Sequence, residues 1–173
     1  MRDFLLDLRS KQRLYSLYGP PRGLMHAVLA DGTIANLLYR LQSHCAALRL
    51  APIAFAIHLI NKWLNGCVIG VRARFGGGLV LIHPIGVVIN SSVVGGRNVW
   101  IESGVVIGDN RGGSPTIGND VFIGSGAKVI GAVRIGDRAR IGANAVVLKD
   151  VLADQTVVGI PARPVTSTSS VPT

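Results

Sequence analysis

The second half of the chain repeats with a period of six residues. Starting at Ile69 and stepping by six, thirteen of fourteen positions are large and apolar. They are Ile69, Phe75, Leu81, Val87, Val93, Val99, Val105, Arg111, Ile117, Ile123, Val129, Ile135, Ile141 and Val147. An amphipathic helix leaves the phase of such a repeat within two turns, and an alternating strand has a period of two. A period of six is typical of a parallel β-helix built from hexapeptides.

Each hexapeptide is therefore expected to form one flat side of a triangular coil. The large apolar residue points inward and stacks on its counterpart one coil, roughly 18 residues, later. The composition agrees, because aromatic residues make up only 5% while there are 22 glycines. The one exception, Arg111, lies in the segment Asp109–Pro115. Since Val105 and Ile117 stay in phase, we expect this segment to leave the coil as a loop.

Residues 1–66 have a helical pattern instead. Apolar spacing predicts helices over residues 3–18, about 24–50 and 52–64, with a break at Gly19–Pro21 and an interruption at Asp31–Gly32. The predicted organisation is a helical region (1–66) that caps the β-helix, the β-helix itself (67–165) and a flexible tail (166–173). The cap would cover strand edges that are otherwise unpaired.

Charge and cysteine content narrow the class of protein. Eighteen Lys and Arg against nine Asp and Glu give a net charge of +9, which indicates an anionic partner. No run of basic residues interleaved with aromatics occurs, so nucleic acid is disfavoured. Two cysteines without metal-ligand spacing predict neither a disulfide framework nor a metal site.

The first seven residues carry acids and no long apolar core, so we expect no signal peptide and a cytoplasmic location. The longest uncharged apolar stretch, residues 50–60, is too short to span a bilayer. A peripheral contact of the basic helical region with the inner membrane face stays open as an alternative.

Four histidines are the candidates for acid–base chemistry. Three of them, His26, His44 and His58, lie in the helical region and are interpreted as surface or packing residues. His83 is the only histidine among the repeats, in a segment reading His-Pro-Ile-Gly-Val-Val-Ile over residues 83–89. The spacing alone does not distinguish a solvent-exposed His83 without a function from a functional His83.

This segment, the repeats and the closing segment Val158–Val165 together resemble the hexapeptide-repeat acyltransferase superfamily. Within this superfamily the chain resembles serine acetyltransferases and the related O-acetyltransferases of surface polysaccharide synthesis, over residues 69–165. It implies a left-handed parallel β-helix and a homotrimer with sites between subunits, with acetyl-CoA as donor. It makes His83 the general base. The backbone of Gly108 would stabilise the oxyanion, and Glu102 or a backbone carbonyl would orient the imidazole.

The resemblance also implies binding residues on both sides of the reaction. The expected CoA-binding residues are Gly124, Ala127, Gly142, Ala143, Lys149, Pro161 and Arg163. The glycines and alanines have a plain alternative as repeat residues, whereas Lys149 and Arg163 match basic positions near the CoA phosphates. The expected acceptor-binding residues are Asn90, Asp109, Asn110 and Arg111.

Three departures from the serine enzymes bear on the acceptor. Ile82 stands where those enzymes have Asp, Gly113–Ser114–Pro115 where they have Arg-His-Pro, and Val68 where they have the Asp that orients the histidine. These losses favour a neutral hydroxyl, and we predict a sugar in surface polysaccharide or glycoconjugate synthesis.

Three alternatives stand beside this prediction. One is serine O-acetylation in cysteine biosynthesis, and another is a non-catalytic β-helix scaffold. The third, a zinc-dependent γ-carbonic anhydrase, needs three histidines around its metal and is disfavoured by the single histidine among the repeats.

Overall fold

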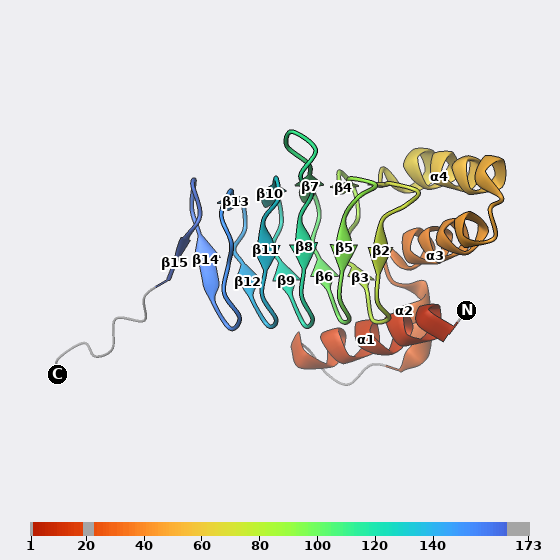
Figure 1. The fold of residues 1–173 in the computed structure, drawn as a ribbon. Helices are drawn as coiled ribbons and strands as arrows, with labels where there is room; N and C mark the ends of the chain where they lie inside the picture. The colour runs from red at the N-terminus through yellow and green to blue at the C-terminus, as the bar shows by residue number, and fades with distance from the viewer. Residues whose placement is uncertain (1, 19–22, 166–173) are drawn as a thin grey trace, which may run out of the picture.

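Four helices precede a β-helix in the computed structural model, which describes residues 2–18 and 23–165 (Figure 1). The helices are α1 (Arg2–Tyr18), α2 (Leu24–Leu29), α3 (Thr33–Ala47) and α4 (Ala51–Asn65). The predicted interruption at Asp31–Gly32 separates α2 from α3, and Gly66 ends α4 with a φ of 58°. The predicted break at Gly19–Pro21 and the predicted tail lie outside the described residues.

Short strands form three sheets, which are the faces of the predicted parallel β-helix and confirm it. Face I contains β1 (Val68–Ile69), β4 (Val88–Ile89), β7 (Val106–Gly108), β10 (Lys128–Ile130) and β13 (Val146–Val147). Face II contains β2 (Arg74–Phe75), β5 (Val94–Gly95), β8 (Thr116–Ile117) and β11 (Arg134–Ile135). Face III contains β3 (Val80–Leu81), β6 (Trp100–Ile101), β9 (Phe122–Ile123), β12 (Arg140–Ile141), β14 (Thr156–Val158) and the antiparallel β15 (Arg163–Pro164).

The thirteen apolar repeat positions are all buried in one core along the axis of the β-helix. On face III the expected stacking every 18 residues holds where Ile123 pairs with Ile141, but in the last coil Ile141 pairs with Val157 at a spacing of 16. Between the first two coils the spacing is 20, because Leu81 pairs with Ile101. Between the second and third coils it is 22, because Ile101 pairs with Ile123. The uniform spacing predicted from the sequence is therefore wrong for the first three coils and for the last coil.

Two insertions explain why the spacing between coils changes and why the apolar positions still recur every six residues along the sequence. The turn after Leu81, which carries His83, holds two extra residues, and the loop after β7 holds four. Together they add one whole hexapeptide, so the phase is restored at Ile117. Between the insertions, Val87, Val93, Val99 and Val105 occupy the other inward-pointing position of each coil and are still buried.

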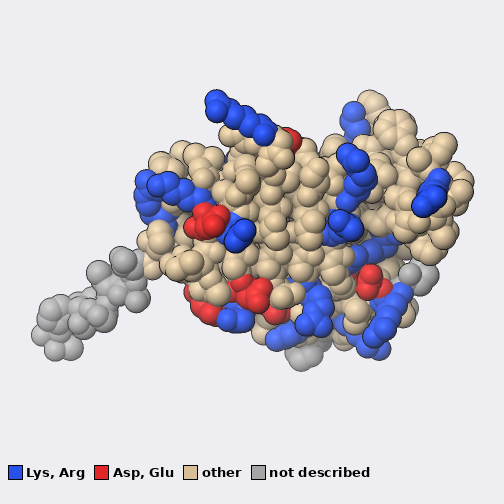
Figure 2. All heavy atoms as spheres, in the orientation of Figure 1, with Lys and Arg blue, Asp and Glu red and all other residues tan. Residues whose placement is uncertain are grey.

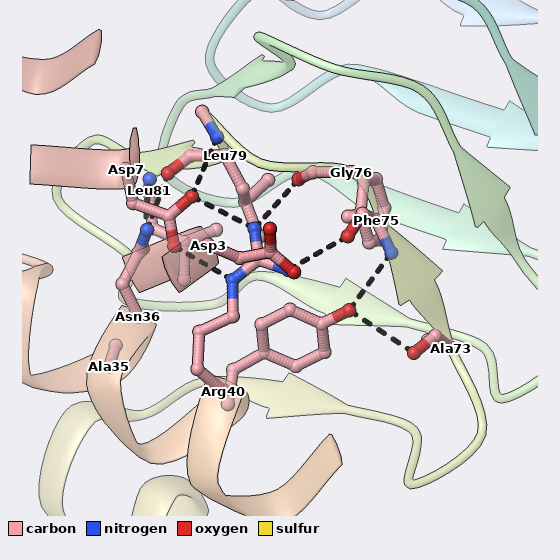
Figure 3. Close-up of polar contacts among 12 residues, drawn as sticks. Asp3, Asp7, Ala35, Asn36, Arg40, Ala73, Phe75, Gly76, Leu79 and Leu81 are labelled. Atoms are coloured by element: carbon pink, nitrogen blue, oxygen red, sulfur yellow. Dashed lines mark hydrogen bonds and ion pairs between the residues drawn. The ribbon is translucent and has the colours of Figure 1, made fainter. Parts of the chain in front are cut away.

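Polar side chains of the helices cap the first coil (Figure 3). The Asn36 amide donates to the carbonyl of Leu79 and accepts from the Leu81 N–H. The Tyr39 hydroxyl donates to the carbonyl of Ala73 and accepts from the Phe75 N–H. These groups have no further coil to pair with on that side, and an unpaired buried backbone group costs about 1–3 kcal/mol. The helices thus replace a missing neighbour coil.

A buried ion pair completes this cap. The Arg40 guanidinium donates to both carboxylate oxygens of Asp7, each at 2.8 Å, and to the carbonyls of Phe75 and Gly76. The N–H of Gly78 also donates to Asp7, at 2.8 Å. Burial raises the pKa of the Asp7 carboxyl, and Arg40 opposes that effect. The pair connects α1 and α3 to the end of β2 and the turn that leads to β3.

Candidate active site

His83 stands on the corner between faces III and I, in the turn that carries the two-residue insertion. Its backbone is left-handed, with φ 48°. Its Nδ1 atom lies 2.9 Å from Oδ2 of Asp31, and the two side chains are 60% and 72% exposed. The structure therefore presents a hydrogen-bonded His–Asp pair to solvent, where a substrate can reach the other ring nitrogen.

Asp31 reaches His83 from the short connection between α2 and α3, and several contacts hold that connection in place. The Lys11 ammonium donates to the backbone carbonyl of Asp31 and to Oγ1 of Thr33. Burial lowers the pKa of Lys11 to about 8, although Asp31 and Asp7 act to raise it. Gly32 has φ 78°, and a Cβ there would collide with the carbonyl oxygen of Leu81. The connection is thus fitted closely against the coil that ends at His83.

The side chain that contacts the His83 imidazole is Asp31 and not Glu102, which was expected from the sequence beside a backbone carbonyl. The Glu102 carboxylate instead accepts a hydrogen bond from the Ser125 hydroxyl at 3.3 Å. Sequence reasoning missed Asp31 because it lies 52 residues before His83. A signal was available, since Asp31 is the only acidic residue between Asp7 and Glu102 and precedes a glycine at a helix interruption.

Ile82 and Val68, the two positions that depart from the serine enzymes near His83, are apolar for visible reasons. Ile82 is buried in a small cluster with Leu14 and Val80, beneath α1. Val68 is half-buried in β1 and pairs with Val88. A carboxylate at position 82 would be buried against leucine and valine in this packing, at a high desolvation cost.

The expected oxyanion and acceptor residues lie at the opposite edge of face I. Gly108 ends β7 there, and Asn90 follows β4 at the same corner. The loop beginning at Asp109 projects from this corner (Figure 1), and Asn110 and Gly113 exchange backbone hydrogen bonds of 2.9 and 3.0 Å across its tip. Arg111 sits at that tip, exposed. Within one chain, face I separates these residues from His83, so the structure does not bring them together.

The expected CoA-side residues divide into two groups. Gly124, Gly142 and the exposed Ala143 follow the His83 corner into later coils, while Ala127 is buried inside the coil. A Cβ on Gly124 would lie 2.8 Å from the Ala143 nitrogen, and one on Gly142 would lie 2.7 Å from Val158. Stacking of the coils therefore accounts for both glycines, as their alternative interpretation held.

Lys149 and Arg163 form the second group and are brought together by the fold. Both line a cavity of about 340 Å³ at the last coil, with Val147, Leu148 and Pro164 among its other walls. Pro161 is exposed in the segment that leads to this cavity, where the Ala162 N–H donates to the carbonyl of Val146. The cavity thus combines two cations with an apolar wall and one carboxylate, Asp150, which accepts a hydrogen bond from the Arg134 N–H; the two cations are suited to an organic phosphate.

No cluster of three or more His, Cys, Asp or Glu side chains in residues 2–18 and 23–165 is arranged to hold a metal ion. None of the helices in this part of the chain is both long and apolar enough to cross a bilayer.

Known proteins resemble the chain in sequence and in structure. Residues 114–149 match the family described as "Bacterial transferase hexapeptide (six repeats)". A serine acetyltransferase of Helicobacter pylori strain J99 is 41% identical over 143 residues, which cover 80% of this chain and 84% of that protein.

Solved serine acetyltransferases share the whole architecture. One from Neisseria gonorrhoeae in complex with serine has a TM-score of 0.86 and 31% identity, over 95% of this chain and 68% of that one. Another in complex with CoA has a TM-score of 0.87 and 26% identity, over the same two shares. The likeness therefore includes the helices as well as the β-helix.

Proposed function

Because the chain belongs to the serine acetyltransferase family of hexapeptide-repeat transferases, we propose that it transfers the acetyl group of acetyl-CoA to the hydroxyl of L-serine. The observation that carries the chemistry is the exposed His83–Asp31 pair, with Nδ1 and Oδ2 2.9 Å apart. The acceptor follows from the relatives, whose names specify serine. The donor follows from the same names and from the solved complex with CoA.

His83 acts as the general base in this proposal. The Asp31 carboxylate accepts a hydrogen bond from Nδ1–H, and this hydrogen bond selects the tautomer in which Nε2 carries a free lone pair. Nε2 takes the proton of the acceptor hydroxyl while its oxygen bonds to the thioester carbonyl carbon. The carbon–sulfur bond then breaks, and the imidazolium returns the proton to the departing thiolate. Positioned proton transfer of this kind contributes about 10²–10⁴-fold to the rate.

Lys149 and Arg163 supply the binding energy for the donor. Their shared cavity at the last coil places two cations where phosphate groups can be bound, and guanidinium groups pair well with phosphate oxygens. Ala143, exposed at the corner that His83 begins, leaves room for an extended chain along that edge. The donor would thus lie along the β-helix with its thioester towards His83.

A second copy of the chain completes the site in this proposal. His83 and the loop Asp109–Arg111 lie at opposite edges of face I, so only a neighbouring subunit can place such a loop, and the Gly108 backbone, near a given His83. Apolar side chains are exposed on and beside this face, with Ile85 73% and Val88 40% exposed. A homotrimer with sites between subunits fits this arrangement. Light scattering on the native chain and on Ile85→Asp tests it, and an unaltered mass of three chains in the variant would contradict it.

One observation favours a second acceptor, a saccharide hydroxyl. The buried Ile82 and the residues Gly113 and Ser114 provide no charge for the amino or carboxylate group of serine. A neutral hydroxyl would need neither. Arg111, at the exposed tip of the loop, is the one basic residue that this loop keeps.

The deciding experiment measures release of CoA thiol from acetyl-CoA with L-serine, simple sugars and nucleotide sugars as acceptors. His83→Ala is the test variant. His44→Ala is the matched control, because His44 is an exposed histidine of α3 away from the site. We expect turnover with L-serine that falls about 10²–10⁴-fold in His83→Ala and is unchanged in His44→Ala. Turnover with a sugar but not with L-serine would show that a sugar is the acceptor. Full activity of His83→Ala would show that His83 is not the general base.

A further inference from the structure

A groove separate from the His83 corner runs between α1 and face III. Its volume is about 600 Å³, which is the size of small-molecule sites in proteins. Helix α1 forms one wall, the corner between faces II and III forms the other, and outward side chains of face III form the floor. His83 belongs to the other corner of face III, so the groove and the candidate active site do not overlap.

Four arginines line this groove, namely Arg9 and Arg13 of α1, Arg97 of the corner and Arg140 of β12. Within the described part of the chain, the side chains of Arg9, Arg13 and Arg97 form no ion pair, unlike those of Arg40 and Arg138. Figure 2 shows Lys and Arg side chains over α1, while the adjoining corner of the β-helix carries both basic and acidic side chains.

The lining of the groove holds four arginines and one carboxylate. Arg9 and Arg13 are four residues apart on one helix, an arrangement in which like charges repel. Asp120 is the one carboxylate of the lining, and it already accepts a hydrogen bond from the Asn98 amide at 2.9 Å. Guanidinium groups that line one cavity and form no ion pair among the described residues are suited to bind the oxygens of a polyanion.

The floor is aromatic. The indole N–H of Trp100 donates to the Ser10 hydroxyl at 2.9 Å, so part of this residue's role is to anchor α1. Phe122 is the next outward residue of face III and lies outside the buried cluster that holds α1. The Arg140 guanidinium lies 4.9 Å from the centre of the Phe122 ring. Half-buried aromatic faces bordered by guanidinium groups can stack on a planar base.

We infer that this groove binds a nucleoside polyphosphate, with its phosphates held by Arg9, Arg13 and Arg97 and its base against Trp100 and Phe122. The inference does not depend on which acceptor the His83 site uses. It assigns to the chain a second ligand, in addition to acetyl-CoA, at a site about one face of the β-helix away from the reaction.

Calorimetric titration of the full chain with ATP tests this inference. Arg13→Gln and Arg97→Gln are each expected to weaken ATP binding about tenfold, because each removes one charge-assisted contact. Arg134→Gln is the matched control, since Arg134 is exposed on face II outside the groove. In the variant Trp63→Phe, which leaves Trp100 as the only tryptophan, ATP is expected to change the tryptophan fluorescence.

Three outcomes would overturn the inference. The first is absence of ATP binding to the native chain. The second is binding that Lys149→Gln abolishes and Arg13→Gln leaves unchanged, because ATP would then occupy the donor cavity. The third is pyrophosphate binding as tight as ATP binding, because the base would then contribute nothing. Equal melting temperatures of the arginine variants and the native chain verify that the fold is intact.

Discussion

The molecule contains two acid–base pairs that connect the helices to the first coil, and they differ in exposure. In the Asp7–Arg40 pair the side chains are 1% and 9% exposed, and each also bonds to backbone groups of the coil. In the Asp31–His83 pair the side chains are 72% and 60% exposed, and Nε2 of the imidazole is left for a substrate. Asp7 and Arg40 both belong to helices and meet the coil through its backbone groups, whereas Asp31 pairs directly with a side chain of the coil.

This difference in exposure indicates which pair stabilises the fold and which pair takes part in the chemistry. A buried pair cannot lose one partner without leaving a charge in an apolar environment. An exposed pair gives little stability, because water competes for both groups, but it is accessible and its tautomer is fixed. The two pairs should therefore respond in opposite ways to substitution.

The largest effect is expected from Arg40→Ala. It leaves the buried Asp7 carboxylate and two backbone carbonyls without their donor, which costs about 3–5 kcal/mol in the free energy of unfolding. Urea unfolding measures it. Arg138→Ala is the control, since its partner Asp154 is exposed and its unfolding midpoint should not move. Similar midpoints for the two variants would show that the buried pair does not hold the cap.

The opposite response is expected from Asp31→Asn. The amide keeps the shape but loses the negative charge that accepts the hydrogen bond from Nδ1–H, so kcat/KM should fall about 10–100-fold, as for a hydrogen bond to a charged group. The melting temperature should stay within a degree or so of the native value, about what a surface change gives. Thiol-release kinetics and a thermal melt on one sample measure both. A lower melting temperature with unaltered kinetics would reverse the roles of the two pairs.

Gly32→Ala tests whether the position of Asp31 matters, because it displaces Asp31 and leaves its carboxylate unchanged. Position 32 has φ 78°, and a methyl group there meets the carbonyl of Leu81. The left-handed backbone alone costs about 1–2 kcal/mol with a side chain, and the displaced connection should lower activity as well. Gly23→Ala is the control, because a Cβ at Gly23 has open space around it. Native-like activity of Gly32→Ala would mean that the position of Asp31 is not critical.

The smallest effect concerns pH and the buried Cys67. Burial raises the pKa of this thiol from 9.0 to about 12. Above pH 9 the unfolded chain therefore loses a proton that the folded chain keeps, so stability falls as pH rises, by about 1.4 kcal/mol per unit. Comparing native chain and Cys67→Ala in urea at pH 9 and 10 isolates this thiol. An equal change in both would show that Cys67 is not protected.

The buried core could be predicted from the sequence, because apolar residues recur every six positions. A repeat over many coils is recognisable even where one position departs from it. The departures were harder to predict. The two insertions together add one hexapeptide, so the count hid the shift that begins at His83 and ends before Ile117. His83 was identifiable as the one histidine in the repeats, whereas its partner Asp31 comes from a distant helix connection that periodicity cannot place.

The most direct test of the catalytic pair is a double-mutant cycle on kcat/KM for thiol release. The four proteins are the native chain, His83→Ala, Asp31→Asn and the double variant. If Asp31 acts through His83, the double variant should be no slower than His83→Ala alone. The substitution of Asp31 has no further effect once the imidazole that it orients is absent. Independent, multiplying losses would contradict the pair and assign Asp31 a role apart from the imidazole.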